Sequence, residues 1–320
     1  MFSWLRKDNW RSSPAHLLLL SKFRLYASPR EFCDKEYWEL ALKQKPSEAI
    51  DIFMKEGVLE RAGLNEAMAF KYKLPDLKSL LKERGLKLSG LKEELIRRLI
   101  ENDTKTMVEA TKDIYLCRCT ASGIALVGNY LESEERKKST AEQEVLRLLQ
   151  LKEYGKAVRS VAEYEATQVF PRGLGIDWEK YDGISDIRCL QTIFNSTPSI
   201  LQTIATDKLD HLRLGAAMMH LWGTNKAQPW LAKEFSTGIR LGVDTACRML
   251  TFHAYHIREL RDFRESGVRS VEILGSYDSC SECRKVIRKK YRLENVPELP
   301  HPKCTREYGC RCTMVIGSFR

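Results

Sequence analysis

The sequence lacks any run of eighteen apolar residues, so it predicts no helix that spans a membrane. It also predicts no secretory signal, because the apolar stretch at residues 17–20 is too short and Lys22 and Arg24 follow at once. The first thirty residues contain arginine and serine and are nearly free of acidic residues, which leaves an organellar transit peptide as an alternative. We interpret this segment instead as a helical part of the folded chain.

The chain also lacks the common catalytic motifs. It contains no G-x-S-x-G, no H-E-x-x-H and no dinucleotide-binding glycine pattern, and the P-R-G-L-G sequence at residues 171–175 lacks the GK[ST] of a phosphate-binding loop. His253 and His256 share a helix face, but no glutamate base or third ligand stands beside them. We interpret them as partly buried, hydrogen-bonded histidines. The sequence therefore favours a protein that is not an enzyme.

What the sequence does contain is an excess of positive charge. Its 320 residues carry a formal net charge of +10, and the pI is about 9.0. The apolar and charged fractions are those of a soluble globular protein, and the length is sufficient for two or three domains. A basic balance of this kind favours an anionic partner, either nucleic acid or a membrane surface.

Apolar periodicity predicts a mainly α fold. The expected parts are a helical N-terminal segment (1–70), a helix–loop–helix module (71–105), a mainly helical central domain (106–265) and a small, cysteine-rich, zinc-ribbon-like α/β tail (266–320). Within the central domain, Cys117 and Cys119 stand two residues apart. We interpret them as core cysteines on one side of a strand rather than as half of a metal site.

The most informative stretch is residues 74–103. Leucines at helical spacing predict a first helix, which begins near Pro75 and ends at Gly85. After a short extended link, Ser89 is expected to cap a second helix. The apolar stripe of this second helix is expected to consist of Leu91, Leu95, Ile96, Leu99 and Ile100.

A basic surface accompanies this pattern. Lys92 lies in the first turn of the expected second helix, where the helix dipole and the free N–H groups prefer an anion. The Ser89 hydroxyl, the backbone N–H groups of Gly90 and Leu91, and the Lys92 ammonium would together suit a phosphate. The alternative is a helical hairpin with an ordinary solvated basic face.

This stretch resembles a SAP module, the small helix–loop–helix DNA-binding motif of chromatin and repair proteins. The matching residues are Leu77, Lys78, Leu80, Leu81, Gly85, Leu86, Ser89, Gly90, Lys92, Leu95, Arg98 and Leu99. One departure is Leu91, where the family often carries a polar or basic residue. The resemblance implies binding of double-stranded DNA, often AT-rich, with little reading of the bases. As DNA-binding residues we predict Lys78, Lys82, Arg84, Lys87, Ser89, Gly90, Lys92 and Arg98.

Five of the ten cysteines lie between residues 280 and 312, which indicates one local site. Without a secretory signal, free thiols or metal ligands are favoured over disulfides. Cys280-x-x-Cys283 has the geometry of a zinc knuckle, and a second group follows at nearly the spacing of a zinc ribbon. We expect a structural zinc ion bound by Cys280, Cys283, Cys310 and Cys312, with Cys304 or His301 as substitutes. The alternatives are a thiol redox pair, which here lacks a thioredoxin-like βαβ context, and free buried cysteines.

The tail also resembles the C-terminal end of phage minor head proteins of the Mu F type. That family ends with a Cys-x-x-Cys unit and a His-Pro-x-Cys-Arg-Cys-Thr sequence, and residues 301–304 and 310–313 match the two ends of this signature. Residues 305–309, which separate them, have no counterpart in the family pattern. The resemblance implies a phage or prophage origin, with a place in the bacterial cytoplasm or in a capsid.

These observations lead to one functional expectation and two alternatives. We expect a non-enzymatic protein that binds double-stranded DNA through the phosphate backbone and does not bind membranes; it would lie in the bacterial cytoplasm, or in the nucleus of a eukaryote. The first alternative is a structural protein of phage head morphogenesis or DNA packaging. The second is a nucleic-acid-processing enzyme with an unrecognised active site, which would need clustered carboxylates to bind magnesium.

Overall fold

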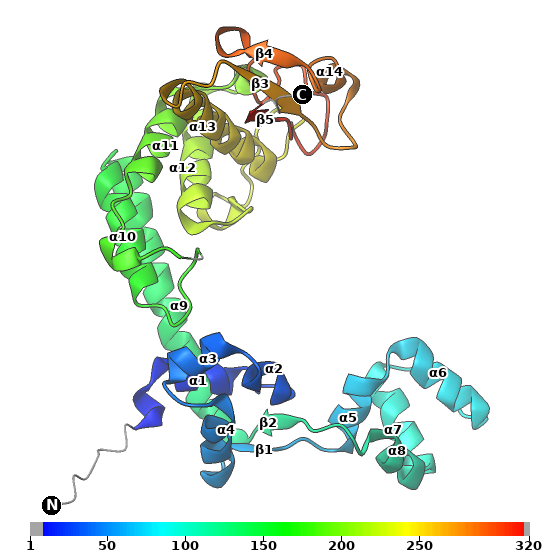
Figure 1. The fold of residues 1–320 in the computed structure, drawn as a ribbon. Helices are drawn as coiled ribbons and strands as arrows, with labels where there is room; N and C mark the ends of the chain where they lie inside the picture. Colours follow the sequence, from blue (N-terminus) through cyan, green and yellow to red (C-terminus); the bar gives the residue numbers. More distant parts are fainter. Residues whose placement is uncertain (1–8, 174, 317–320) are drawn as a thin grey trace, which may run out of the picture. The chain divides into compact units, whose positions relative to one another are not determined.

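The computed structural model describes residues 9–173 and 175–316 (Figure 1). The described chain is mainly helical, as the sequence predicts. Contacts divide it into two compact units, Met1–Lys137 and Lys138–Arg320, and the division falls inside the 30-residue helix α9 (Ala121–Gln150). Among the described residues, no helix is both long enough and apolar enough to cross a membrane.

The first unit contains short helices joined by brief links. In chain order they are η1 (Trp10–Ser12), α1 (Pro14–Ser21), α2 (Arg30–Cys33), α3 (Glu36–Leu42), α4 (Pro46–Lys55), β1 (Leu59–Arg61), α5 (Leu64–Lys71), α6 (Leu74–Glu83), α7 (Lys92–Asn102), α8 (Thr104–Thr111), β2 (Cys117–Cys119) and the start of α9. The helical interpretation of the first thirty residues is confirmed for η1 and α1, whereas residues 22–29 form turns and a β-bridge, and residues 1–8 lie outside the described part.

A two-stranded ladder joins two distant segments of this unit, the one before α5 and the one before α9. β1 pairs antiparallel with β2, with Leu59 opposite Cys119. Cys117 and Cys119 are both buried, whereas Arg118 between them is exposed. This alternation confirms the interpretation of the two cysteines as core residues on one side of a strand. Burial also raises the pKa of the Cys119 thiol to about 11, as expected for an inert core cysteine.

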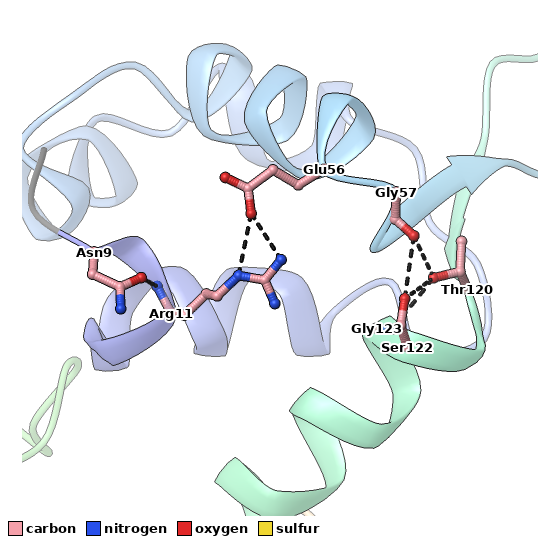
Figure 2. A network of polar contacts seen from close by, with 7 residues as sticks. All are labelled: Asn9, Arg11, Glu56, Gly57, Thr120, Ser122 and Gly123. Atoms are coloured by element: carbon pink, nitrogen blue, oxygen red, sulfur yellow. Dashed lines mark hydrogen bonds and ion pairs between the residues drawn. The ribbon is translucent and has the colours of Figure 1, made fainter.

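The N-terminus of α9 is held against the turn between α4 and β1 (Figure 2). Two hydroxyl groups donate to the Gly57 carbonyl oxygen, Thr120 Oγ1 at 2.7 Å and Ser122 Oγ at 3.3 Å. Thr120 Oγ1 also accepts from the Gly123 N–H, which satisfies a free donor of the first helical turn. At the same end of α4, the neighbouring Glu56 accepts from Arg11 Nε and Nη2 at 3.2 and 2.8 Å. These contacts join three segments that are far apart in sequence.

Gly123 leaves no room for a side chain at this junction, which leads to a stability prediction. A Cβ atom there would lie 2.0 Å from the Val58 carbonyl oxygen, so the backbone would have to move. We expect Gly123→Ala to lower the free energy of unfolding by about 1–3 kcal/mol. Gly128→Ala, in the same helix but with no atom within 4 Å of the added Cβ, should instead stabilise by roughly 0.5–1 kcal/mol. Urea unfolding followed by circular dichroism distinguishes the two, and equal effects would contradict the close approach of α9.

The second unit combines long helices with a small sheet. In chain order it contains the end of α9, α10 (Tyr154–Ala166), η2 (Trp178–Lys180), α11 (Ile184–Asn195), η3 (Ser199–Leu201), α12 (Thr206–Trp222), η4 (Gln228–Trp230), α13 (Val243–Glu265), β3 (Ser270–Leu274), α14 (Ser281–Arg284), β4 (Lys290–Arg292), η5 (Leu293–Asn295) and β5 (Thr313–Ile316). The strands form one antiparallel sheet in the order β4-β3-β5.

The cysteine-rich tail shares a hydrophobic core with the helices. One buried cluster joins Leu212 of α12 and Leu250 of α13 to Ile273 of β3 and Met314 of β5. All four side chains are at most 5% exposed. The sheet therefore uses the helices to bury its apolar face, which so small a sheet could not do alone.

Candidate nucleic-acid interface and cysteine site

The predicted helix–loop–helix is present as α6 and α7, and it does not stand alone. Leu77 and Leu81 of α6 meet Leu95 and Leu99 of α7, and all four are fully buried. The same cluster includes buried methionines from α5 and α8, Met68 and Met107. A pair of short helices buries too little apolar surface to be stable by itself, and the flanking helices supply the rest.

The end of α6 follows the sequence prediction. Gly85 adopts a φ of +66°, a left-handed conformation that glycine accepts without strain. Its N–H donates to the Lys82 carbonyl at 3.1 Å, and the Leu86 N–H donates to the Leu81 carbonyl at 2.9 Å. This pair of bonds is the Schellman motif, which ends a helix and turns the chain sharply. The link to α7 therefore leaves α6 in a fixed direction.

The start of α7 corrects the sequence prediction. The helix begins at Lys92 and not after Ser89, and its N-cap is Leu91. The reason is that Glu94 performs the capping from inside the helix, since its Oε2 accepts from the Leu91 N–H at 3.0 Å. Leu91 is consequently 73% exposed rather than part of the apolar stripe, whereas Leu95, Ile96 and Leu99 are buried as predicted.

Three of the predicted cationic residues contact the domain's own backbone. Lys92 Nζ donates at 2.7 Å to the Ala69 carbonyl in the last turn of α5, so the partial negative charge of that helix end serves as its partner. Arg84 donates to the Leu80 carbonyl and forms an ion pair of 3.4 Å with Asp103. Arg98 donates to the carbonyl groups of Lys87 and Ser89 and so holds the loop in place.

The other five predicted residues face the solvent. Lys78 and Lys82 lie four residues apart on one exposed side of α6, and Lys87, Ser89 and Gly90 form the exposed link to α7. Within the described residues, none of these three lysines makes an ion pair; the domain's recorded pairs are those of Arg84, with Glu83 and Asp103, and of Arg97 with Glu101. We call the five residues Lys78, Lys82, Lys87, Ser89 and Gly90 the lysine face.

The five cysteines of the tail gather in space. The sulfur atoms of Cys280, Cys283 and Cys304 lie within 4.8 Å of one another, and so do those of Cys283, Cys310 and Cys312. Cys283 belongs to both groups. The Sγ atoms of Cys280 and Cys304 are 3.9 Å apart, and those of Cys283 and Cys310 are also 3.9 Å apart. The cluster can therefore hold a metal ion that prefers thiolate ligands.

Backbone N–H groups favour thiolate at two positions of this cluster. Burial by itself would raise the pKa of Cys280, but the N–H groups of Thr305 and Cys283 donate to its sulfur and lower the pKa to about 6. Hydrogen bonds from neighbouring thiols, that of Cys283 first, hold the pKa of Cys310 well below its ordinary value. The His301 N–H also donates to this sulfur, at 3.3 Å. Thiolate is the form of cysteine that binds metal.

His301 thus contacts the cluster through its backbone. Neither recorded three-residue group within the described ranges includes its imidazole. Cys304, which the sequence analysis gave as a substitute ligand, is fully buried and lies in the group around Cys280.

The two histidines at residues 253 and 256 are hydrogen-bonded, as predicted, and they are buried rather than only partly buried. His253 Nε2 lies 2.8 Å from Ser196 Oγ and its Nδ1 lies 3.2 Å from the Leu299 carbonyl. His256 Nδ1 lies 3.3 Å from Glu259 Oε2. His253 therefore connects α13 to two other segments, whereas the His256 contact stays within α13.

A second buried histidine network was not apparent in the sequence. His220 of α12 lies 3.0 Å from Asp186 Oδ1 and 2.9 Å from the Tyr255 hydroxyl, and the Cys189 sulfur is 3.9 Å away. The residue types suggest a cysteine–histidine–aspartate triad. However, Cys189 is 1% exposed, and burial raises the pKa of its thiol to about 12, so it is an inert core thiol. The network joins α11, α12 and α13.

This network makes the free energy of unfolding of the second unit decrease at low pH. Burial by itself would raise the pKa of Asp186, but contacts with His220 and Tyr181 outweigh it and hold the pKa below the ordinary value. A lowered pKa stabilises the fold above the ordinary Asp pKa of about 3.9, and this contribution is lost as the pH falls. We expect Asp186→Asn to lower the free energy of unfolding near neutral pH. The further decrease of this free energy below about pH 4 should be smaller in the variant than in the parent. Urea unfolding over this pH range provides the measurement, and an unchanged acid dependence in the variant would contradict the assignment.

Comparison with known proteins agrees with the geometry of α6 and α7. Residues 68–104 match the model of the SAP domain family. The match runs from the end of α5 to the first residue of α8. No curated protein and no solved structure matches the chain at a significant level. Residues 68–104 are therefore a SAP domain, and this domain indicates a protein that binds nucleic acid.

Proposed function

We propose that the protein is a non-enzymatic binder of double-stranded DNA whose lysine face contacts the phosphate backbone. The observation that carries this proposal is the exposure of all five lysine-face residues within the matched domain, while the leucine core between α6 and α7 is buried together with Met68 of α5 and Met107 of α8. Three ammonium groups, a hydroxyl and a backbone N–H are the donors that phosphate oxygens accept. Such contacts position a protein on a duplex without reading its sequence.

Arg84, Lys92 and Arg98 play a positioning role in this proposal. Arg98 donates hydrogen bonds to the carbonyl groups of Lys87 and Ser89, which fixes the backbone of the exposed loop. Lys92 attaches the first turn of α7 to the end of α5. The phosphate contact is therefore centred on Lys87, Ser89 and Gly90, in the link that precedes the N-terminus of α7.

The size of the lysine face sets the strength of binding. Three lysines that each neutralise one phosphate contribute about −3 to the slope of log affinity against log salt concentration. A contact of this size supports binding in the micromolar range or weaker at physiological salt, roughly that of non-specific binding.

Titration with fluorescent duplex and single-stranded DNA at two salt concentrations tests this function. We expect duplex to bind more tightly than the single strand, with an affinity that falls steeply as salt increases. Binding of neither, or an affinity that does not respond to salt, would contradict the proposal.

We also propose that the cysteine cluster binds one structural zinc ion. In a tetrahedral site with Zn–S bonds of about 2.3 Å, the sulfur atoms are roughly 3.8 Å apart. The Cys280–Cys304 and Cys283–Cys310 sulfur separations of 3.9 Å are close to this spacing. We therefore assign Cys280, Cys283, Cys304 and Cys310 as ligands, so that Cys304 replaces Cys312 in the predicted set. The ion would fix the two long links on either side of β4.

The tail's sequence supports a role in a phage head as the alternative function. The matching residues of that signature include Cys304 and Cys310, which lie in the same cluster. An assembly protein forms oligomers of defined stoichiometry, so light scattering of the purified protein separates the two functions. A strict monomer at all concentrations would contradict an assembly role.

A further inference from the structure

A basic groove lies in the second unit, far in sequence from the SAP domain. The end of α13, the link to β3, and β4 line a hollow of about 940 Å³. Its charged lining consists of Arg264, Arg269, Lys290, Arg292 and Glu294. Four cations thus face one carboxylate. We call this hollow the tail groove.

The cations of the tail groove are exposed and have no acidic partner. Arg264, Arg269, Lys290 and Arg292 are all exposed, and within the described residues none of them makes an ion pair. Lys285, just before them in the tail, shows the contrast, since it pairs with Glu282 at 2.6 Å. Like charges that gather without partners repel one another, and an arriving anion relieves that repulsion.

The backbone holds these side chains in a defined frame. Lys290 and Arg292 are alternate residues of β4 and share its exposed face, whereas Tyr291 between them packs against the core. β4 is fixed by its pairing with β3, in which Arg292 stands opposite Ser270. The Leu293 N–H donates to the Arg269 carbonyl at 3.3 Å, which keeps Arg269 beside the strand. Three of the four charges therefore lie on α13 and β4, and the Leu293–Arg269 hydrogen bond fixes the backbone of the fourth.

The number and spread of the cations indicate the class of ligand. Lys290 and Arg292 are about 7 Å apart along the strand, and Arg264 and Arg269 come from another element. One small anion would neutralise only part of this set, whereas a polyanion with regularly spaced charges neutralises all of it. The presence of a SAP domain in the same chain favours nucleic acid over an anionic membrane surface.

We propose that the tail groove binds the sugar–phosphate backbone of nucleic acid, so that the chain has a contact surface in each of its two units. The nature of the partner rests on the proposed function of the SAP domain, but the contact itself does not. Two surfaces on one chain raise the overall affinity, because the second contact forms at a high effective concentration.

Salt-dependent binding of the full chain to a fluorescent duplex tests the proposal. The groove variant carries Arg269→Gln, Lys290→Gln and Arg292→Gln. The matched control carries Arg159→Gln, Lys226→Gln and Lys233→Gln, three exposed cations of the same unit that lie outside the groove and make no ion pair in the described part of the chain. Both are made in the parent and in a background with Lys78, Lys82 and Lys87 changed to glutamine.

We expect the groove variant to reduce the magnitude of the log–log salt slope by about 2 to 3 in both backgrounds, and the control to change it much less. Equal behaviour of the groove variant and the control would overturn the proposal. So would a groove variant that loses binding only to vesicles with anionic lipid and keeps its affinity for the duplex. A lysine-face background that binds like the parent, while the groove variant does not, would refute the SAP surface and leave the groove standing.

A second variant guards against a folding defect. If thermal unfolding shows that the triple variant is damaged, Arg264→Gln with Lys290→Gln removes one charge from each side of the groove. We expect it to reduce the slope by about 2, and an unchanged slope in this folded variant would equally overturn the proposal.

Discussion

Changing Lys78, Lys82 and Lys87 to glutamate is expected to weaken duplex binding on the order of a hundredfold or more near 0.1 M salt. Each lost phosphate contact forfeits the release of about one counterion, which is worth roughly eightfold at this salt concentration, and the three effects multiply. The fold should be retained, because all three side chains are exposed and make no ion pair in the described structure. Fluorescence anisotropy with a labelled duplex measures the affinity.

A matched control separates this effect from a change in net charge. Lys35, Lys45 and Lys55 are exposed lysines of the same unit that lie outside the SAP domain and outside its neighbouring helices. Changing them to glutamate alters the net charge by the same amount. If the control weakens binding as much as the lysine-face variant, the contact is a general charge effect and the assigned surface is wrong.

Cys283→Ser is expected to abolish metal binding and to unfold the second unit's sheet. The purified parent should carry about one zinc ion per chain. A structural zinc ion supplies about 10–16 kcal/mol of binding free energy in small thiolate sites, which is comparable with the whole stability of a domain. Cys283 lies in both sulfur groups, so its loss cannot be made good by the remaining cysteines. Metal analysis and thermal unfolding provide the measurements.

Further variants distinguish the ligand sets. Cys304→Ser should lose the metal as Cys283→Ser does, whereas Cys312→Ser should retain it. Cys33→Ser, in the first unit and outside the cluster, serves as the control. Metal-free parent protein with an intact fold would end the zinc proposal, and zinc loss in Cys312→Ser but not in Cys304→Ser would restore the set predicted from the sequence.

Local sequence signals predicted the SAP helices because those helices are determined locally. The spacing of Leu77, Leu81, Leu95 and Leu99 fixes the buried faces, and Gly85 supplies the backbone conformation that ends α6. The same reasoning failed at the start of α7. Serine is a good cap in general, but the choice between caps depended on which side chain reached the free N–H group, and Glu94 did.

What sequence reasoning missed depends on contacts between distant residues. Lys92 seemed to need an external anion because its partner, the Ala69 carbonyl, belongs to a helix 23 residues earlier. The network around His220 was not predicted because Asp186 and Tyr255 lie on other helices. Helical periodicity reports which face of an element is buried, but it does not report what that face meets.

The cysteine cluster was predicted in part from local sequence and in part depends on contacts between distant residues. Clustering along the chain showed that five cysteines form one site, and their spacing suggested a zinc ribbon. Which of these sulfur atoms lie close together depends on the path of residues 285–309, which include β4 and η5. That path places the Cys304 sulfur 3.9 Å from the Cys280 sulfur. The spacing of the cysteines along the sequence does not predict this contact.

Amide chemical-shift mapping of the full chain during titration with a short duplex tests the central claim most directly. The account predicts that the largest shifts in the first unit occur at Lys87, Ser89 and Gly90 and along the exposed side of α6, with small shifts in α8. Duplex-induced shifts that fall on α8 and spare the lysine face, or no shifts in the SAP domain while the duplex is bound, would contradict it.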